Sequence, residues 1–499
     1  MRNLSKSKLM AFRQCEKRLW LEIHRPDLRQ DSEATKANFR EGHRVGEIAR
    51  QLYDPEGAGQ LIDAQSEGYA GALARSIELL GSAKPIFEAG FAAKGALAFA
   101  DVMLPADQSG RRAWRMIEVK SSTSVKDYHR EDVAIQAFVA RSAGVPLEAI
   151  ALAHIDSSWT YPGGGDYRGL LREQDLTAEA FACGAEVQSW IEKAQGIARL
   201  PVEPEITTGG QCAVPFECGF LDHCRSQEPQ AEFPVRWLPR IQSEALRTLI
   251  EGKGAADLRD VPDDLLNGQQ RRVKACSLSD EVYFDAQGAA AELARHESPA
   301  YFLDFETIRF AVPIWQGARP YQTVPFQFSV HRLSADSVLE HRPYLDLSGD
   351  DPSKALAEAL IAACDERGPV FVYSSFEATR IRELAERYPE LKAPLLAIKD
   401  RIVDLYRIAQ RCYYHPSQKG SWSIKDVLPA IAPDMRYDAL PGVKDGGMAM
   451  EAYLEAISTA TSRARRDQIA DELRQYCALD TQAMVRLWEV FSGRRQPAS

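Results

Sequence analysis

The sequence lacks long apolar runs. No stretch of its 499 residues approaches the about 18 uninterrupted apolar residues of a membrane-spanning helix, so we expect no membrane partner. The opening MRNLSKSKLMAFRQC carries basic residues without the apolar core of a secretory signal, so we expect a cytoplasmic location. Low-complexity composition is missing as well, because 45% hydrophobic and 26% charged residues are ordinary values for a globular chain.

The chain also lacks an excess of basic residues. The chain has 61 lysine and arginine residues against 71 aspartate and glutamate residues, which gives a net charge of −10. This argues against a chain covered in basic residues, although an acidic protein can still hold a local basic groove for a polyanion. Residues 2–29 contain eight basic and three acidic side chains, which fits either a solvated helix face or an entry that contacts phosphates.

Length and pattern predict more than one domain. At about 150 residues per domain, the chain has room for three domains, or for two large ones with a connector. We place a first domain at 1–228, a helical connector at 229–297 and a second domain at 298–499. The fold class is α/β, because buried strands such as PAYFLDFET and GPVFVY alternate with helices in the second domain. The connector fits either a plain spacer or a helix-hairpin-helix-like segment that holds a DNA phosphate.

Acidic residues and a lysine are grouped in the first domain. Asp101 follows a run of small apolar residues, and the next strand ends in Glu118-Val-Lys120. Residues i and i+2 of a strand share a face, so Glu118 and Lys120 project together and a hairpin brings Asp101 alongside. Two carboxylates can hold Mg²⁺ or Mn²⁺, and the ammonium group can orient a water molecule and offset charge on a phosphate.

Two further residues extend this group into a known pattern. His43 stands on a predicted helix upstream and Gln136 on one downstream. The set resembles the PD-(D/E)xK nuclease superfamily in its RecB-like branch, which implies a restriction-endonuclease-like fold. In the family, Tyr often stands four residues after the Gln, where this chain has Ala140. By that resemblance, the metal ligands are His43, Asp101 and Glu118. Lys120 would assist the attacking water, and Gln136 would contact the substrate or support the site.

Nine cysteines are too few for a disulfide scaffold in a chain of this size. Three of them are spaced by five residues each, at Cys212, Cys218 and Cys224, and Cys15 lies far upstream. RecB-like nucleases that carry an iron–sulfur cluster have one such cysteine near the N-terminus and three after the nuclease core, so the resemblance implies a [4Fe–4S] cluster on these four. The alternatives are Zn²⁺, with His223 as a possible ligand, and plain buried thiols.

A second acidic group lies in the C-terminal domain. Asp304 and Glu306 occupy positions i and i+2 of a strongly apolar strand, where two acids are costly unless a cation pairs them. Glu377 stands at a helix start after another buried strand. Tyr476 and Asp480 are four residues apart, so they share one face of a helix.

This second group resembles the DEDD exonuclease superfamily (DnaQ-like) in its Tyr-containing subgroup. The resemblance implies an RNase H-like sheet flanked by helices, two Mg²⁺ ions held by the four carboxylates, and Tyr476 orienting the attacking water. Glu377 replaces the aspartate that this family normally carries at that position. The segment GSWSIKDVLP resembles the substrate-side helix of the same family, which implies nucleic-acid contacts by Lys419, Trp422 and Lys425. The two lysines would meet phosphates, and Trp422 would either stack on a base or simply pack in the protein.

Together the two resemblances cover most of the chain, and the pairing resembles a bacterial protein family that combines an iron–sulfur RecB-like nuclease domain with a DEDD-type domain. They imply a metal-dependent nuclease with two hydrolytic centres acting on DNA with single-stranded or frayed ends, including 3′–5′ exonuclease activity. One alternative is a nucleic-acid-binding protein with one live centre and one inactive clamp. The other is an RNA-processing exonuclease, because nothing in the sequence reads a 2′-hydroxyl group.

Overall fold

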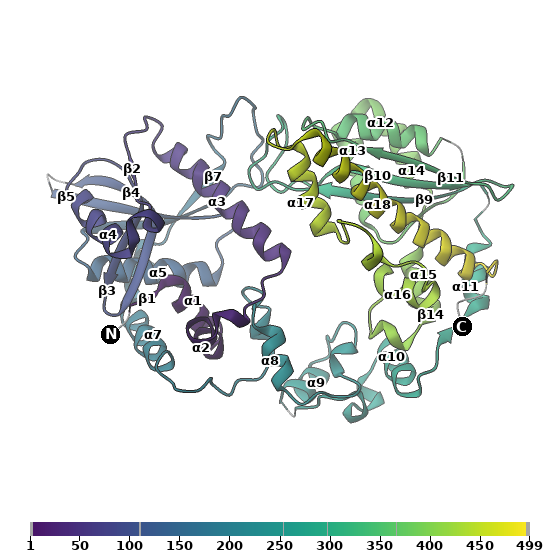
Figure 1. Ribbon diagram of the computed structural model, residues 1–499, viewed down its shortest axis with the longest axis horizontal. Coiled ribbons are helices and arrows are strands. Elements are labelled where there is room, and N and C mark those ends of the chain that lie inside the picture. Colours follow the sequence, from purple (N-terminus) through teal and green to yellow (C-terminus); the bar gives the residue numbers. More distant parts are fainter. Residues whose placement is uncertain (1–2, 109–110, 253, 297, 366, 496–499) are drawn as a thin grey trace. The chain divides into compact units, whose positions relative to one another are not determined.

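The computed structural model describes residues 3–108, 111–252, 254–296, 298–365 and 367–495. It divides the chain into two compact units (Figure 1). The first unit is Met1–Pro229 with Phe310–Gln322, and the second is Gln230–Arg309 with Thr323–Ser499. The segment expected as a connector therefore folds with the second unit, and a short piece of the expected second domain folds with the first. In the described ranges, no helix is both long and apolar enough to cross a membrane.

The first unit is built on a mixed sheet. Its strands follow the order β2-β3-β4-β5-β6-β7, and β1 pairs with β4. The neighbours β3, β4 and β5 are antiparallel, whereas β5 and β6 are parallel and are joined through helix α5. The strands are β1 (Leu4–Ser5), β2 (Gln60–Leu61), β3 (Ile86–Ala93), β4 (Ala96–Gln108), β5 (Arg111–Lys120), β6 (Leu147–Ile155) and β7 (Leu171–Asp175).

Helices cover both faces of this sheet. The main core packs α1, α4, α5 and α7 against one face, and α3 packs against the other. Alternation along β5 produces this division, since Met116 joins the main core and Ile117 joins the opposite cluster. The helices are α1 (Lys6–Gln14), α2 (Glu16–His24), α3 (Glu33–Tyr53), α4 (Ala64–Leu79), α5 (Asp127–Ser142), α6 (Thr177–Ala182), α7 (Gly184–Ile197) and α8 (Leu221–Gln227).

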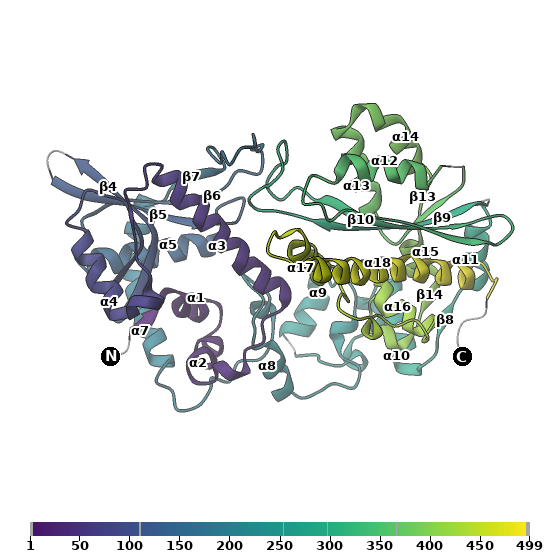
Figure 2. The same cartoon turned by 45° about the horizontal axis from the view of Figure 1, so that its top comes forward.

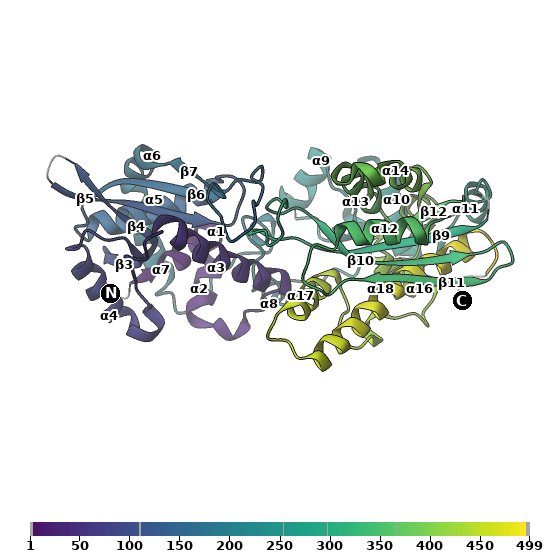
Figure 3. The same cartoon turned by 90° about the horizontal axis from the view of Figure 1, so that it is seen from above.

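The second unit contains a five-stranded sheet in the order β11-β10-β9-β12-β13. The first three strands are antiparallel, and β9, β12 and β13 are parallel. Helices α12, α13 and α14 lie on one face, and α17 and α18 lie on the other (Figures 2 and 3). The strands of this sheet are β9 (Ala300–Ile308), β10 (Val324–Leu333), β11 (Leu339–Leu345), β12 (Val370–Val372) and β13 (Ile402–Asp404).

The α/β class expected from the sequence is confirmed, and the strands expected in PAYFLDFET and GPVFVY are present as β9 and β12. A serine at position 462 caps the long helix α18 by accepting a hydrogen bond from the Arg465 amide. Buried aliphatic and aromatic residues then recur along its length. The helices of this half are α12 (Ser353–Ala363), α13 (Phe376–Arg387), α14 (Lys392–Lys399), α15 (Leu405–Cys412), α16 (Ile424–Ile431), α17 (Gly446–Ile457) and α18 (Arg463–Phe491).

The segment before β9 is made of short pieces. It holds α9 (Glu244–Arg247), α10 (Gly268–Ser279), the strand β8 (Tyr283–Phe284) and α11 (Ala286–Leu293), with β8 pairing β14 (Tyr413–Tyr414). The helix-hairpin-helix reading is wrong, because the second helix it requires is only the 3₁₀ turn Leu258–Asp260. Pro262 follows directly after that turn and its flanking residue, so the chain does not continue as a helix.

Candidate active sites

The first candidate site lies at the end of β5. Glu118 and Lys120 lie on one face of this strand, two residues apart, and point toward α5. The Lys120 ammonium group donates to Glu118 Oε1 at 2.6 Å and to Asp132 Oδ2 at 2.6 Å. Only 1% of Glu118 is exposed, so this carboxylate is balanced inside the protein rather than by water.

Asp101 stands where β4 and β5 separate. The paired register of the two strands begins at Val102 and Ile117, so the Val119 amide has no backbone partner on β4. The side chain of Asp101 replaces that partner by accepting the Val119 N–H at 2.7 Å. This bond holds the Asp101 carboxyl against β5, where it interacts electrostatically with Glu118 and Lys120.

Two residues that the motif does not contain complete the site. Lys6, the first residue of α1, donates to Glu118 Oε1 at 2.7 Å and lies 3.0 Å from Asp132 Oδ1. Asp132 is buried on α5, one turn before Gln136. The Gln136 amide donates to Glu118 Oε2, and its own oxygen is buried without a hydrogen-bond partner. The site therefore contains two lysines, and its Gln136 oxygen is a buried acceptor that receives no hydrogen bond.

The acids of the first site differ in how readily they ionise. Burial raises the pKa of Asp101 well above its usual range, and the Glu118 carboxylate adds to the rise. Burial acts the same way on Asp132, but the ammonium groups of Lys120 and Lys6 outweigh it and hold the Asp132 pKa below its usual range. Burial disfavours the charged form of Lys120, yet Asp132 and Glu118 raise its pKa well above the usual range.

His43 is less closely placed than the motif predicts. It is exposed on α3 and interacts electrostatically with Glu88, a half-buried acid whose pKa is raised by burial and by Glu118. Glu88 has a φ of 57°, a left-handed conformation, and the pairing of β3 with β4 skips this residue and Asp101 opposite it. Ala140, at the position of the family's tyrosine, is fully buried and offers no substrate contact.

The second candidate site lies on the middle strand of the other sheet. Asp304 and Glu306 project from β9 toward α18. Among the described residues, one set of three ligand atoms lies within 4.8 Å of one another, and it comprises Asp304, Glu306 and Cys477. The Cys477 thiol donates to Asp304 Oδ2 at 3.7 Å. Donor atoms suited to a divalent cation are therefore already gathered here.

Helix α18 brings the remaining motif residues to β9. Tyr476 and Asp480 both lie on its buried face. The Tyr437 hydroxyl donates to Asp480 Oδ1 at 2.6 Å, and the Lys425 ammonium group donates to the Tyr476 hydroxyl at 3.3 Å. Lys425 also lies 5.2 Å from the centroid of each tyrosine ring, a cation–π arrangement that fixes both.

Glu377 lies near this group, although it is a glutamate where the similar family has an aspartate. It occupies the first turn of α13, is buried, and accepts a hydrogen bond from Ser374 Oγ at 3.2 Å. Electrostatic interactions join it to Asp404, which ends β13, and to Asp480. The acids on β9, at the start of α13, at the end of β13 and on α18 therefore interact with one another electrostatically.

The acids of the second site resist ionisation together. Burial raises the pKa of Asp304 and Glu306 well above the usual range, and Asp480 is the first charged neighbour to add to each rise. Burial raises the pKa of Glu377 to about 7 and that of Asp480 to about 6. Burial and the same acids raise the pKa of Tyr476, so its hydroxyl keeps its proton. A bound cation would relieve this repulsion.

The proposed nucleic-acid residues divide into different environments. Lys425 belongs to the second site itself, and the Lys419 ammonium group lies 6.0 Å from the centroid of the Trp237 ring. The assignment of Trp422 is wrong, because only 3% of this residue is exposed and its indole N–H donates to the Tyr413 carbonyl at 2.8 Å. A base cannot stack on a ring that is enclosed by the core.

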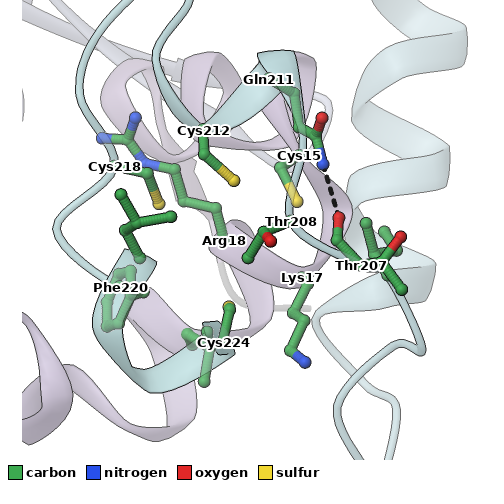
Figure 4. A pocket seen from close by; sticks show the side chains of 13 residues that line it. Cys15, Lys17, Arg18, Thr207, Thr208, Gln211, Cys212, Cys218, Phe220 and Cys224 are labelled. Atoms are coloured by element: carbon green, nitrogen blue, oxygen red, sulfur yellow. Dashed lines mark hydrogen bonds between the residues drawn. The ribbon is translucent and has the colours of Figure 1, made fainter. Parts of the chain in front are cut away.

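The four expected cysteines come together in the first unit. They line one pocket, and their sulfur atoms point into its common space (Figure 4). Cys15 lies at the junction of α1 and α2, and Cys224 lies on α8. The loop that carries Cys212 is held by Gln14, whose side-chain amide donates to the carbonyls of Gln211 and Phe216 at 2.7 Å each.

The spacing of these thiols separates the possible ligands. A zinc ion with about 2.3 Å bonds would hold its sulfur atoms about 3.8 Å apart. Within the described part of the chain, no three of these sulfurs lie within 4.8 Å of one another. His223, the alternative zinc ligand, is absent from the pocket lining and contacts Glu203 Oε2 at 3.2 Å. This spacing does not match a single zinc ion held by three or more of these thiols.

The sequence patterns missed three residues of the two sites. Asp132 had a usable signal, since it stands four residues before Gln136 on one helix face. Lys6 and Tyr437 had none, because tertiary structure alone brings them to their carboxylates.

Comparison with known proteins finds similar sequences, and their descriptions name no activity. A family model described as a domain of unknown function (DUF2779) matches residues 301–423, which include Asp304, Glu306 and Glu377. The uncharacterized protein MG366 of Mycoplasma genitalium is 26% identical over 208 residues, or 37% of this chain and 31% of that protein. Its homolog in Mycoplasma pneumoniae is 27% identical over 211 residues, 38% of this chain and 32% of the homolog. The matches thus cover about a third of the length of these relatives.

Proposed function

We propose that the chain is a metal-dependent nuclease with two hydrolytic centres that acts on DNA with single-stranded or frayed ends. The centre on β9 would remove nucleotides from 3′ ends, and the centre on β5 would be a RecB-like nuclease. The observation that carries the proposal is the group of acids on β9, α13 and α18: ligand atoms of Asp304 and Glu306 lie within 4.8 Å of each other and of Cys477 Sγ, and the buried acids Glu377 and Asp480 interact electrostatically with Asp304. Such a group is stable when divalent cations bind it.

The residues fit Mg²⁺ or Mn²⁺ at the second centre. Asp304 and Glu306 offer hard oxygen ligands, and Lys425 is the cation placed beside them. Bound divalent ions would stabilise charge on a phosphate and ease deprotonation of water. Tyr476, held by Lys425 and kept protonated by its surroundings, would orient the attacking water through its hydroxyl group.

The residues of the first centre fit one divalent ion less completely. Asp101 and Glu118 would hold it, and the buried Gln136 oxygen, which has no hydrogen-bond partner, is a further polar group next to Glu118. His43 interacts electrostatically with Glu88 and would be a further ligand. Lys120 would stabilise negative charge on the phosphate, since its surroundings keep the ammonium group protonated.

The fold supports both assignments at the level of topology. The sheet with order β11-β10-β9-β12-β13, covered by helices on both faces, agrees with an RNase H-like exonuclease. The antiparallel β3-β4-β5 strands followed by α5 and a parallel β6 agree with a PD-(D/E)xK domain. The four-thiol pocket would hold a [4Fe–4S] cluster that fastens the N-terminal helices to the segment near 212–224.

The test is degradation of single-stranded DNA labelled at the 5′ or 3′ end, with Mg²⁺ or Mn²⁺, by protein purified without oxygen. Glu118→Ala and Asp304→Ala should each remove a different product pattern. Glu131→Ala and Glu386→Ala are matched controls, because these partly exposed acids lie on α5 and α13 outside both sites. An RNA oligonucleotide of the same sequence runs beside the DNA.

Each outcome has one meaning. Loss of distinct products in the two variants supports two active centres. Loss in Asp304→Ala alone makes the first centre a clamp, and faster RNA cleavage assigns an RNA-processing role. A wild-type protein that cleaves neither polymer with either metal contradicts the proposal.

A further inference from the structure

Asp132 is the common partner of both lysines in the first centre. Its Oδ2 accepts from Lys120 at 2.6 Å, and its Oδ1 lies 3.0 Å from the Lys6 ammonium nitrogen. Only 5% of Asp132 is exposed, so the carboxylate is balanced by these two cations. A buried acid that contacts two lysines fixes the distance between their ammonium groups.

Glu118 connects the same lysines on the other side. Its Oε1 accepts from Lys6 at 2.7 Å and from Lys120 at 2.6 Å. The four groups therefore form a closed ring of alternating charge in which each ammonium group contacts both carboxylates. Lys6 enters this ring from α1, a helix that lies outside the strand–turn motif carrying Asp101, Glu118 and Lys120.

We propose that Lys6 and Asp132 are positioning residues of the first centre, with Asp132 holding two lysines, rather than one, against the carboxylate that binds metal. The inference rests on the proposed nuclease function and extends it. A divalent ion that engages Glu118 would displace an ammonium group from it, and Lys6 is the one expected to leave, because its contact with Asp132 is longer, at 3.0 Å, than the 2.6 Å bond of Lys120. The released Lys6 ammonium group would remain near the carboxylates and offset negative charge on a substrate phosphate.

This role predicts opposite effects of one substitution on two measurements. Lys6→Met removes a positive charge that competes for Glu118, so a divalent ion should bind more tightly, by roughly tenfold. The same change removes a cation from the phosphate, so the turnover number should fall by roughly tenfold or more, with a smaller change in KM. A variant that merely damaged the site would weaken metal binding and turnover together.

The experiment uses the full chain with Asp304→Asn and Glu306→Gln, so that only the first centre binds Mn²⁺ and cleaves. Mn²⁺ affinity is measured by electron paramagnetic resonance, and turnover is measured on end-labelled single-stranded DNA. Lys6→Arg keeps the charge and should restore most of the turnover. Lys8→Met is the matched control, because Lys8 lies on the same helix and donates to the Glu22 carbonyl instead.

Asp132→Asn gives the complementary result. It removes a negative charge and releases both lysines, so Mn²⁺ should bind more weakly and turnover should fall. The proposal is overturned if Lys6→Met weakens Mn²⁺ binding or behaves like Lys8→Met. If the unmodified chain cleaves no polymer while Lys6→Met still tightens Mn²⁺ binding, the nuclease function fails and the position of Lys6 in the metal site is supported.

Discussion

At the residue scale, Glu377 links the acids of the second centre to stability. Burial raises its pKa to about 7 in the folded chain, against 4.5 as the ordinary value for glutamate. Between these two pH values the folded protein binds more protons than the unfolded chain, so the free energy of unfolding falls as the pH rises. The contribution is fully present below about pH 4.5 and is lost above about pH 7.

We therefore predict that metal-free protein is less stable at pH 8 than at pH 5. In Glu377→Gln this decline should be smaller by on the order of 2 kcal/mol, because the amide does not ionise. Urea unfolding of both proteins at the two pH values measures it, with Glu386→Gln as the exposed control on the same helix. Equal declines in wild type and Glu377→Gln would contradict the electrostatic account, whereas added Mg²⁺ should reduce the decline in wild type.

Tyr476 offers a second test on a single atom. Its hydroxyl group is held by Lys425 and remains protonated in these surroundings. Tyr476→Phe should lower release of 3′-terminal nucleotides by about 10- to 100-fold, while Mg²⁺ affinity stays the same, since the carboxylates are untouched. Tyr344→Phe, which removes a half-buried hydroxyl on β11, is the control. A parallel loss of metal affinity would make Tyr476 a structural residue instead.

At the element scale, helix α1 joins two features of the first unit. It begins at Lys6, in the first centre, and is followed at once by Cys15, in the four-thiol pocket. Cys15→Ser should abolish the visible absorption of the iron–sulfur cluster and lower turnover at the first centre, leaving release of 3′-terminal nucleotides by the second centre intact. Cys183→Ser, which changes a thiol at the end of α6 outside the pocket, should alter neither. Zinc in place of iron and sulfide in purified protein would contradict the cluster.

Sequence pattern predicted elements best where the local signal was strong. The apolar run of β9 and the long periodic helix α18 were foreseen, and with them the second set of acids. In the first centre, Lys120 was predicted from its place two residues after Glu118, but Lys6 was not, because it reaches Glu118 across 112 residues of chain. Trp422 was misread because aromatic residues near lysines occur both in nucleic-acid grooves and in cores, and only burial separates these cases.

At the scale of the whole molecule, the first unit is built from two parts of the chain that lie far apart in the sequence. The segment Phe310–Gln322 leaves β9 four residues after Glu306, folds with the first unit, and returns as β10. Its Ala311 amide donates to Glu41 at 3.0 Å, and the Tyr321 hydroxyl donates to the carbonyl of Ser121, next to Lys120. Val312 is buried in a cluster with Val45 and Ile48 of α3. The first unit is therefore incomplete without residues that lie between the strands of the second sheet.

Because the segment Phe310–Gln322 folds with the first unit, we predict that residues 1–229 and 230–499, expressed together as separate chains, co-purify as one complex. Val312→Asp should abolish or strongly weaken the complex, because it places an unpaired charge in an apolar cluster. Ile314→Asp is the matched control, since Ile314 lies on the same segment and is 39% exposed. Affinity capture of a tag on one half, followed by quantification of the other, measures the outcome. If Val312→Asp and Ile314→Asp co-purify equally well, the segment is not part of the core of the first unit.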